Sequence, residues 1–162
     1  MANKFSKLVK TVYKLPKFSH EYLLTKLFCS QVKYANTSRV KIHRISNTDA
    51  ELSLANSKRV QNHIGGVHAV AASLLAESAT GIVFGMNVPD SHLPLLKSMT
   101  VNYNRRMQGD LKAIATLTTE QIQTIESAEK GDLVVAVTIT DESGQEPIEC
   151  LMNWAWVPKK RK

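Results

Sequence analysis

Residues 62–84 read NHIGGVHAVAASLLAESATGIVF, and this stretch decides the fold. A polar loop with two glycines and two histidines leads into a run of small and apolar residues. Glu77 is the only ionised side chain between His68 and Asp90. A helix that is apolar on all sides is buried, and a carboxylate is rarely buried without a partner or a task. The stretch therefore predicts a buried central helix over residues 67–84 that carries one candidate functional acid.

The segments on either side of this helix have the period of strands. Residues 40–45 and 50–54 alternate around the turn at residues 46–49, which predicts a hairpin. Residues 129–132 and 141–144 have the composition of further hairpin turns. The strands expected after the helix cover residues 95–104, 110–124, 132–140 and 147–157. One buried helix followed by an antiparallel meander predicts an α+β fold.

The two ends of the chain differ from its body. Residues 1–37 are expected to form a basic helical extension, and Ser19 is a plausible N-cap for its second helix. Apolar residues recur at helical spacing between lysines over residues 3–15. We expect their apolar face to dock on the protein, with contact to a membrane surface as the alternative. The main domain is expected over residues 38–158, followed by a basic tail at residues 159–162.

The net charge of +7 conceals an uneven distribution. Residues 1–44 hold ten Lys and Arg against one acid, whereas residues 45–158 hold seven against thirteen. An acidic body with basic ends argues against a nucleic-acid-binding domain. Two cysteines, Cys29 and Cys150, make no disulfide framework, and no segment reaches the ~20 apolar residues that span a bilayer. We therefore expect a cytoplasmic protein.

Three residues of the opening stretch resemble a family motif. Asn62, His68 and Glu77, which lie six and nine positions apart, are similar to the pattern of the hotdog-fold acyl-CoA thioesterases related to the phenylacetate-pathway enzymes. The sequence from Asn62 to Glu77 looks especially like the branch of this family that carries Glu on the central helix. The resemblance covers residues 38–158 and implies a sheet wrapped around a central helix. It also implies a substrate that is acyl-CoA or an acyl carrier protein, and a homodimer or dimer of dimers with sites between protomers.

The resemblance also implies roles for these residues. Glu77 would be the general base or the nucleophile, and Asn62 would position water or the carboxylate. The backbone N–H near Ala69 would form an oxyanion hole at the helix start, where unpaired N–H groups gather. Gly66 would allow the substrate to approach, and His68 would shape the loop or bond the leaving thiolate. Burial should raise the pKa of Glu77 and make it a better base.

Two further sites follow from the same likeness. Arg105 and Arg106 follow a predicted strand and would face the phosphates of coenzyme A, although exposed solubilising charge explains them equally well. His63 and Glu77 lie fourteen apart, as in the hotdog dehydratases that act on hydroxyacyl carrier proteins. No metal or other cofactor is implied, because no Cys or His pair has the spacing of a zinc site.

Plainer interpretations stay open beside these roles. Glu77 could be a structural carboxylate, His68 a loop histidine and Asn62 a turn or capping residue. A non-catalytic protein that binds acyl groups or lipids in the same cleft is the alternative from another functional class. We expect a thioesterase, with the dehydratase as second choice.

Overall fold

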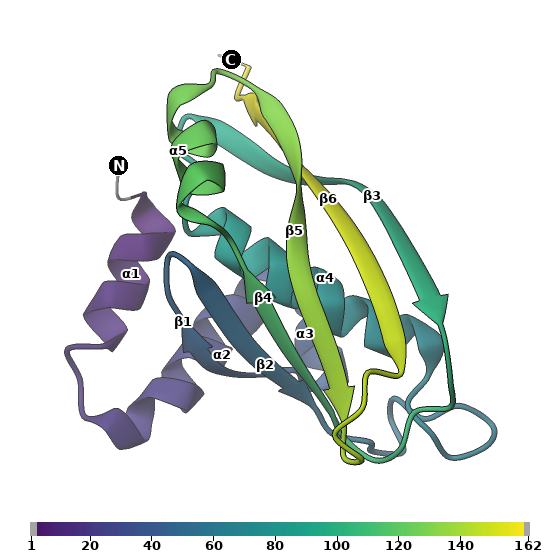
Figure 1. The fold of residues 1–162 in the computed structure, drawn as a ribbon. Coiled ribbons are helices and arrows are strands. Elements are labelled where there is room, and N and C mark those ends of the chain that lie inside the picture. The colour runs from purple at the N-terminus through teal and green to yellow at the C-terminus, as the bar shows by residue number, and fades with distance from the viewer. Residues whose placement is uncertain (1–2, 161–162) are drawn as a thin grey trace.

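Within residues 3–160, which this computed structural model describes, one antiparallel sheet of six strands lies across the central helix α4 (Figure 1). Residues 161–162 of the predicted tail lie outside this range. In chain order the elements are α1 (Lys4–Val12), a 3-10 turn (Lys17–Ser19), α2 (His20–Gln31), α3 (Lys33–Ser38), β1 (Lys41–Ile45), β2 (Asp49–Leu54), α4 (Ala69–Gly85), β3 (His92–Tyr103), β4 (Leu111–Thr116), α5 (Thr119–Ser127), β5 (Gly131–Asp141) and β6 (Ile148–Pro158).

The strand order is β1-β2-β4-β5-β6-β3. The predicted hairpin of β1 and β2 is confirmed, with Ile45 opposite Ala50. The simple meander predicted for the last four strands is wrong in one respect, because β3 pairs with β6 and not with β4. Along this pair Met99 lies opposite Met152, so both strands turn apolar side chains to the same face. As a result β3 is an edge strand whose second side has no partner strand within residues 3–160.

The strand predicted over residues 110–124 is also wrong in its second half. Strand β4 ends at Thr116, and helix α5 follows. The Thr118 hydroxyl accepts the N–H of Gln121 at 3.2 Å, and the Gln121 side chain accepts the N–H of Thr118 at 2.9 Å. This reciprocal capping box starts a helix, and its Thr-x-x-Gln signature is the signal that the strand prediction overlooked. The connection from α5 to β5 is residues 128–130, so residues 129–132 do not form a hairpin turn.

Helix α4 and strand β6 make the centre of the core. The ring of Phe84 lies 5.8 Å from that of Trp154 and 6.2 Å from that of Trp156. The indole N–H of Trp154 donates to the Thr80 hydroxyl at 2.9 Å. A Cβ atom at Gly81 would lie 2.8 Å from the Trp154 ring, so only glycine permits this approach of helix and strand. On β6 one alternating set of side chains is buried: Cys150, Met152, Trp154 and Trp156.

The N-terminal helices pack against the rest of the protein. Val9 on α1 is buried in the same cluster as α4, so the expected docking of the apolar face of residues 3–15 is confirmed. The Asn3 amide donates to the carbonyls of Gly85 and Val88 at 2.7 and 2.6 Å, which fixes α1 to the end of α4. The division between extension and main domain at residue 38 stays a prediction.

Helix α2 covers the edge of the sheet opposite β3. The Thr25 hydroxyl accepts the N–H of Ile42 on β1 at 2.9 Å, so the edge strand has a side-chain partner there. No helix in the described part of the chain has both the length and the hydropathy to cross a membrane.

Candidate active site

The loop at residues 62–68 is built by the side chain of Asn62. Its carbonyl oxygen accepts the N–H groups of Ile64 and Gly66 at 3.0 and 3.1 Å. The Asn62 N–H donates to the Gly66 carbonyl at 2.8 Å, and Gly65 has a φ of 78°, which favours glycine. Asn62 is thus a turn residue in this loop, while its amide nitrogen has no acceptor among residues 3–160. A Cβ at Gly66 would meet only ordinary contacts, 3.5 Å from the Met107 carbonyl.

His68 caps the helix that follows. Its Nδ1 accepts the N–H of Val70 at 3.1 Å, so the neutral ring carries its proton on Nε2. The N–H groups of Ala71 and Ala72 donate to the His68 carbonyl at 2.9 and 3.1 Å. The N–H of Ala69 is left without an acceptor in the described part of the chain. A free, helix-terminal donor of this kind can polarise a carbonyl oxygen.

Glu77 lies half-buried on α4, eight residues beyond Ala69. Burial raises the pKa of its carboxyl group above the ordinary value, because the surroundings disfavour the charged form. Within residues 3–160 the carboxylate has no ion-pair or hydrogen-bond partner. A half-buried acid with no structural partner fits a chemical task better than a structural one.

One narrow stripe of α4 remains accessible, although the sequence predicted a helix with no solvent face. Beyond the first turn, the residues of α4 that are not buried are Glu77, Gly81 and Gly85, and they succeed each other at one-turn spacing. In the direction of Gly85 the stripe opens into an apolar groove of about 370 Å³ between α1, α2 and α4. The groove is lined by Phe5, Leu8, Leu27, Phe28, Gln31, Val32, Gly81, Ile82 and Gly85.

Two hydroxyl groups that the sequence analysis missed lie beside the helix start. The Tyr103 hydroxyl on β3 donates to the Ala69 carbonyl at 3.0 Å and lies 2.8 Å from the Ser73 hydroxyl. The alternation of β3 could have placed Tyr103 on the α4 face. Two other hydroxyl side chains of β3, Ser98 and Thr100, pair with Asn153 and Leu151. They therefore lie on the other face of the sheet, away from α4.

The two predicted phosphate-binding arginines have different environments. Arg105 donates to the carboxylate of Asp141 and to the Ser143 hydroxyl, both at 2.8 Å, so it has internal partners. Arg106 is exposed and donates to the Ile64 carbonyl at 2.9 Å, which ties it to the candidate loop. Burial alone would raise the pKa of Asp141. Hydrogen bonds from Ser143, the Gln108 N–H and Arg105 nevertheless lower it to about 2.

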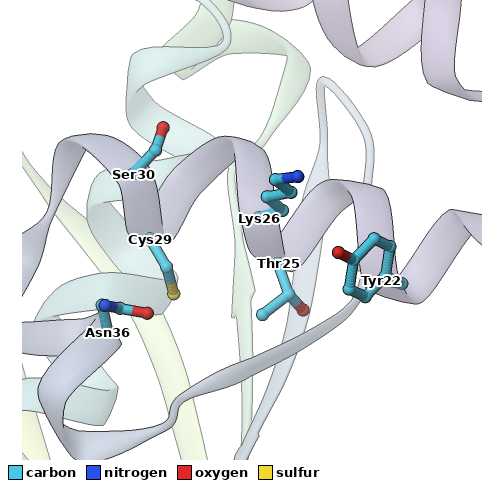
Figure 2. A pocket seen from close by; sticks show the side chains of 6 residues that line it. All are labelled: Tyr22, Thr25, Lys26, Cys29, Ser30 and Asn36. Atoms are coloured by element: carbon cyan, nitrogen blue, oxygen red, sulfur yellow. The ribbon is translucent and has the colours of Figure 1, made fainter.

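The structure does not bring all predicted residues together within one chain. Ala69 and Glu77 are separated by about 12 Å along the helix axis. His63 is exposed in the loop and has no hydrogen bond to Glu77. Residues 3–160 contain no group of three or more His, Cys, Asp or Glu side chains that could hold a metal ion. A separate hollow of about 410 Å³ lies on α2 and contains none of the predicted residues (Figure 2).

Comparisons with known proteins identify the architecture. A family model described as "Domain of unknown function (DUF4442)" matches residues 21–157. A crystal structure of a protein of unknown function from Pseudomonas aeruginosa, described as a probable thioesterase, has a TM-score of 0.77 and 23% identity, covering 90% of this chain and 97% of that one. A thioesterase from Haemophilus influenzae has a TM-score of 0.68 and 16% identity, with coverage of 85% and 90%.

A mutant thioesterase from Staphylococcus aureus gives a TM-score of 0.66 and 18% identity, covering 78% of this chain and 99% of that one. No curated protein matches the sequence. The structural similarities confirm the predicted α+β hotdog fold.

Proposed function

Because the chain belongs to the DUF4442 family and folds like proteins described as thioesterases, we propose that it hydrolyses acyl thioesters. The observation that carries the proposal is the Glu77 carboxylate. It is half-buried, its pKa is raised by that burial, and it lies on the one accessible stripe of a buried helix. These are the properties of a general base that works near neutral pH.

In the proposed reaction Glu77 takes a proton from water, and the oxygen of that water attacks the thioester carbonyl carbon. The negative charge that develops on the carbonyl oxygen is stabilised by the free N–H of Ala69. Collapse of the intermediate breaks the carbon–sulfur bond, and the leaving thiolate takes up the proton held by Glu77, which restores the carboxylate. Removing one donor of this kind costs enzymes on the order of 10²–10³ in kcat. Direct attack by Glu77 on the carbonyl carbon is the covalent variant of the same scheme.

We propose that each site combines two protomers. The ~12 Å between Ala69 and Glu77 is too long for one carbonyl to reach both in the same chain. The outer side of strand β3 has no partner strand within residues 3–160, and the strand carries the exposed apolar residues Leu93, Leu95 and Met99. Pairing of this edge with its copy would cover it and bring a second helix start toward Glu77. A homodimer, or a dimer of dimers, follows.

The acyl chain would extend from Glu77 past Gly81 into the apolar groove at Gly85, since that groove contains no charged side chain. The nucleotide end of an acyl-CoA would lie toward Arg106, whose position is tied to the candidate loop. The acyl chain of an acyl carrier protein would occupy the same groove, and the carrier protein would take the place of the nucleotide at the outer surface. A cytoplasmic location agrees with the two free, buried thiols Cys29 and Cys150.

The test of the base is Glu77→Gln, which keeps the shape of the side chain and removes the charge. Thiol release from medium-chain acyl-CoA should fall at least about 100-fold. Glu129→Gln, an exposed carboxylate outside the site, is the matched control and should keep the wild-type rate. Unfolding curves establish that both variants fold. Undiminished turnover by a folded Glu77→Gln protein would refute the assignment.

The test of the shared site is complementation between two inactive variants. Ala69→Pro removes the free N–H at the first helical position, where proline is tolerated, and the preceding His68 already has a ψ of 140°. In a 1:1 mixture with Glu77→Gln that has exchanged subunits, one of the two sites in each mixed dimer is intact, so about a quarter of the wild-type rate should return. Absence of recovery would show that one chain supplies both groups.

The other candidates have no specific observation in their favour. A dehydratase needs His63 and Glu77 on one substrate, and His63 is an exposed loop residue without a contact to Glu77. A non-catalytic acyl-binding protein would bind acyl-CoA saturably and release no thiol above background in the same assay.

A further inference from the structure

The corner between α1 and α2 carries the most exposed large apolar side chain of the described residues. Phe18 is 90% exposed, Tyr22 one turn later is 65% exposed and Leu15 is 47% exposed. Aromatic side chains of this size are rarely so exposed unless they meet a partner. We call these three residues, together with Lys14 and Lys17, the corner face.

The corner face lies in a strongly cationic neighbourhood. Residues 1–44 hold ten Lys and Arg, and their one acid, Glu21, bonds His43 at 2.7 Å. None of the side-chain ammonium groups of the lysines on α1, on α2 or in the turn between them has a carboxylate partner among residues 3–160, although the backbone N–H of Lys4 donates to Asp90. The positive charge of this surface is therefore not neutralised from within the described chain.

The surface beside the corner face is hollowed and mixes apolar and basic groups. One hollow of about 410 Å³ is lined by Phe18, Glu21, Tyr22, Thr25 and Lys41. The next hollow shares Tyr22 with it and continues past Lys26, whose ammonium lies 5.8 Å from the centre of the Tyr22 ring (Figure 2). Aromatic rings next to unpaired lysines are the side chains that prefer the headgroup region of a bilayer.

We propose that the corner face docks the protein on anionic phospholipid membranes, with Phe18 inserted at the level of the headgroups. Charge complementarity selects this partner, because lysines without carboxylate partners lie beside the apolar residues. Near an anionic lipid surface each such lysine increases the binding affinity about fivefold. The membrane contact that was only the alternative for residues 3–15 is here placed at the corner, because the apolar face of α1 packs against the protein core.

The position of the corner is compatible with the proposed dimer and independent of the proposed reaction. Helix α2 packs on β1, and β1 and β3 are opposite edges of the sheet (Figure 1). A partner chain on β3 therefore leaves the corner face free in both protomers. Two such faces on one dimer would bind a vesicle more tightly than one.

The proposal is tested by sedimentation of the full chain with vesicles. One set contains phosphatidylcholine alone, and the other contains phosphatidylcholine with phosphatidylserine. Binding to the anionic set should be strong at low salt and weaken as salt rises. Phe18→Ser should reduce it about tenfold, and the pair Lys14→Gln and Lys17→Gln about 25-fold. Both changes are at exposed positions, so folding is preserved.

The controls are Val134→Ser, which removes an apolar side chain that is 46% exposed on β5, and Lys130→Gln, which removes an exposed charge far from the corner. Both should bind vesicles like the wild type. Equal binding to neutral vesicles, no binding to either set, or an equal loss in the controls would overturn the proposal. Binding to heparin that is indifferent to Phe18→Ser, without vesicle binding, would instead identify an acidic macromolecule as partner.

Discussion

Asp141 offers the sharpest test of the electrostatics that hold the candidate site. Its side chain is 0% exposed, and it accepts from Arg105 at 2.8 Å and from the Gln108 N–H at 2.9 Å. It therefore ties the loop after β3, which includes Arg106 and its bond to the Ile64 carbonyl, to the end of β5. Asp141→Asn keeps the shape but removes the charge that these donors face.

The size of the effect follows from the pKa of Asp141. The pKa falls from 3.8 to about 2 in the folded protein. At about 1.4 kcal/mol per tenfold change in acidity, the ionised form stabilises the fold by ~2 kcal/mol at neutral pH. Because the folded pKa is the lower one, this stability is present above pH 4 and is lost as the pH falls through 2.

Urea unfolding, followed by the fluorescence of the buried Trp154 and Trp156, measures the difference. The free energy of unfolding of Asp141→Asn should be about 2 kcal/mol lower than that of the wild type at pH 7. The values of the two proteins should converge as the pH falls toward 2. Asp132→Asn is the control, since the Asp132 side chain is 39% exposed and its partner Lys97 is exposed too, so its effect should be much smaller. A loss for Asp141→Asn that does not change with pH would refute the reasoning.

The remaining predictions concern the helix and its groove. Because burial raises the pKa of Glu77, activity should fall on the acid side at a higher pH than the pKa of an ordinary carboxyl group. By the same shift the wild type loses stability as the pH rises through that pKa, and urea unfolding should show Glu77→Gln to be the more stable protein at neutral pH. A Cβ at Gly85 has open space, so Gly85→Leu should fill the groove and lower kcat/KM by about fourfold for each methylene displaced, while short acyl-CoAs are unaffected. Tyr103→Phe removes the bond to the Ala69 carbonyl and should cost about 1 kcal/mol of unfolding free energy. Ser78→Ala should raise the free energy of unfolding by about 0.5–1 kcal/mol, because the buried Ser78 hydroxyl has no hydrogen-bond partner within residues 3–160.

Local patterns were sufficient wherever one periodic signal dominated. The apolar run around Glu77 predicted α4, and the alternation of residues 40–45 and 50–54 predicted the hairpin of β1 and β2. The prediction failed at residues 117–124, where alternating apolar residues suggested a strand. There the Thr118–Gln121 capping box started a helix, since it satisfies N–H groups that a strand end would leave open.

The sequence by itself determined the parts that rest on local chemistry. Asn62, Gly65 and His68 build and cap their loop through bonds within a few residues. Glu77 was identified because no other charge occurs on its helix.

Only the tertiary structure decided how these parts meet. The pairing of β3 with β6, the bond of Tyr103 to α4 and the groove beside Gly85 join residues far apart in the chain. The hydrogen bond from Arg105 to Asp141 also depends on the tertiary structure, because the two residues lie 36 positions apart in the sequence. Residue type specifies what a side chain can bind. Packing specifies which partner is within reach and which carboxylate is left accessible.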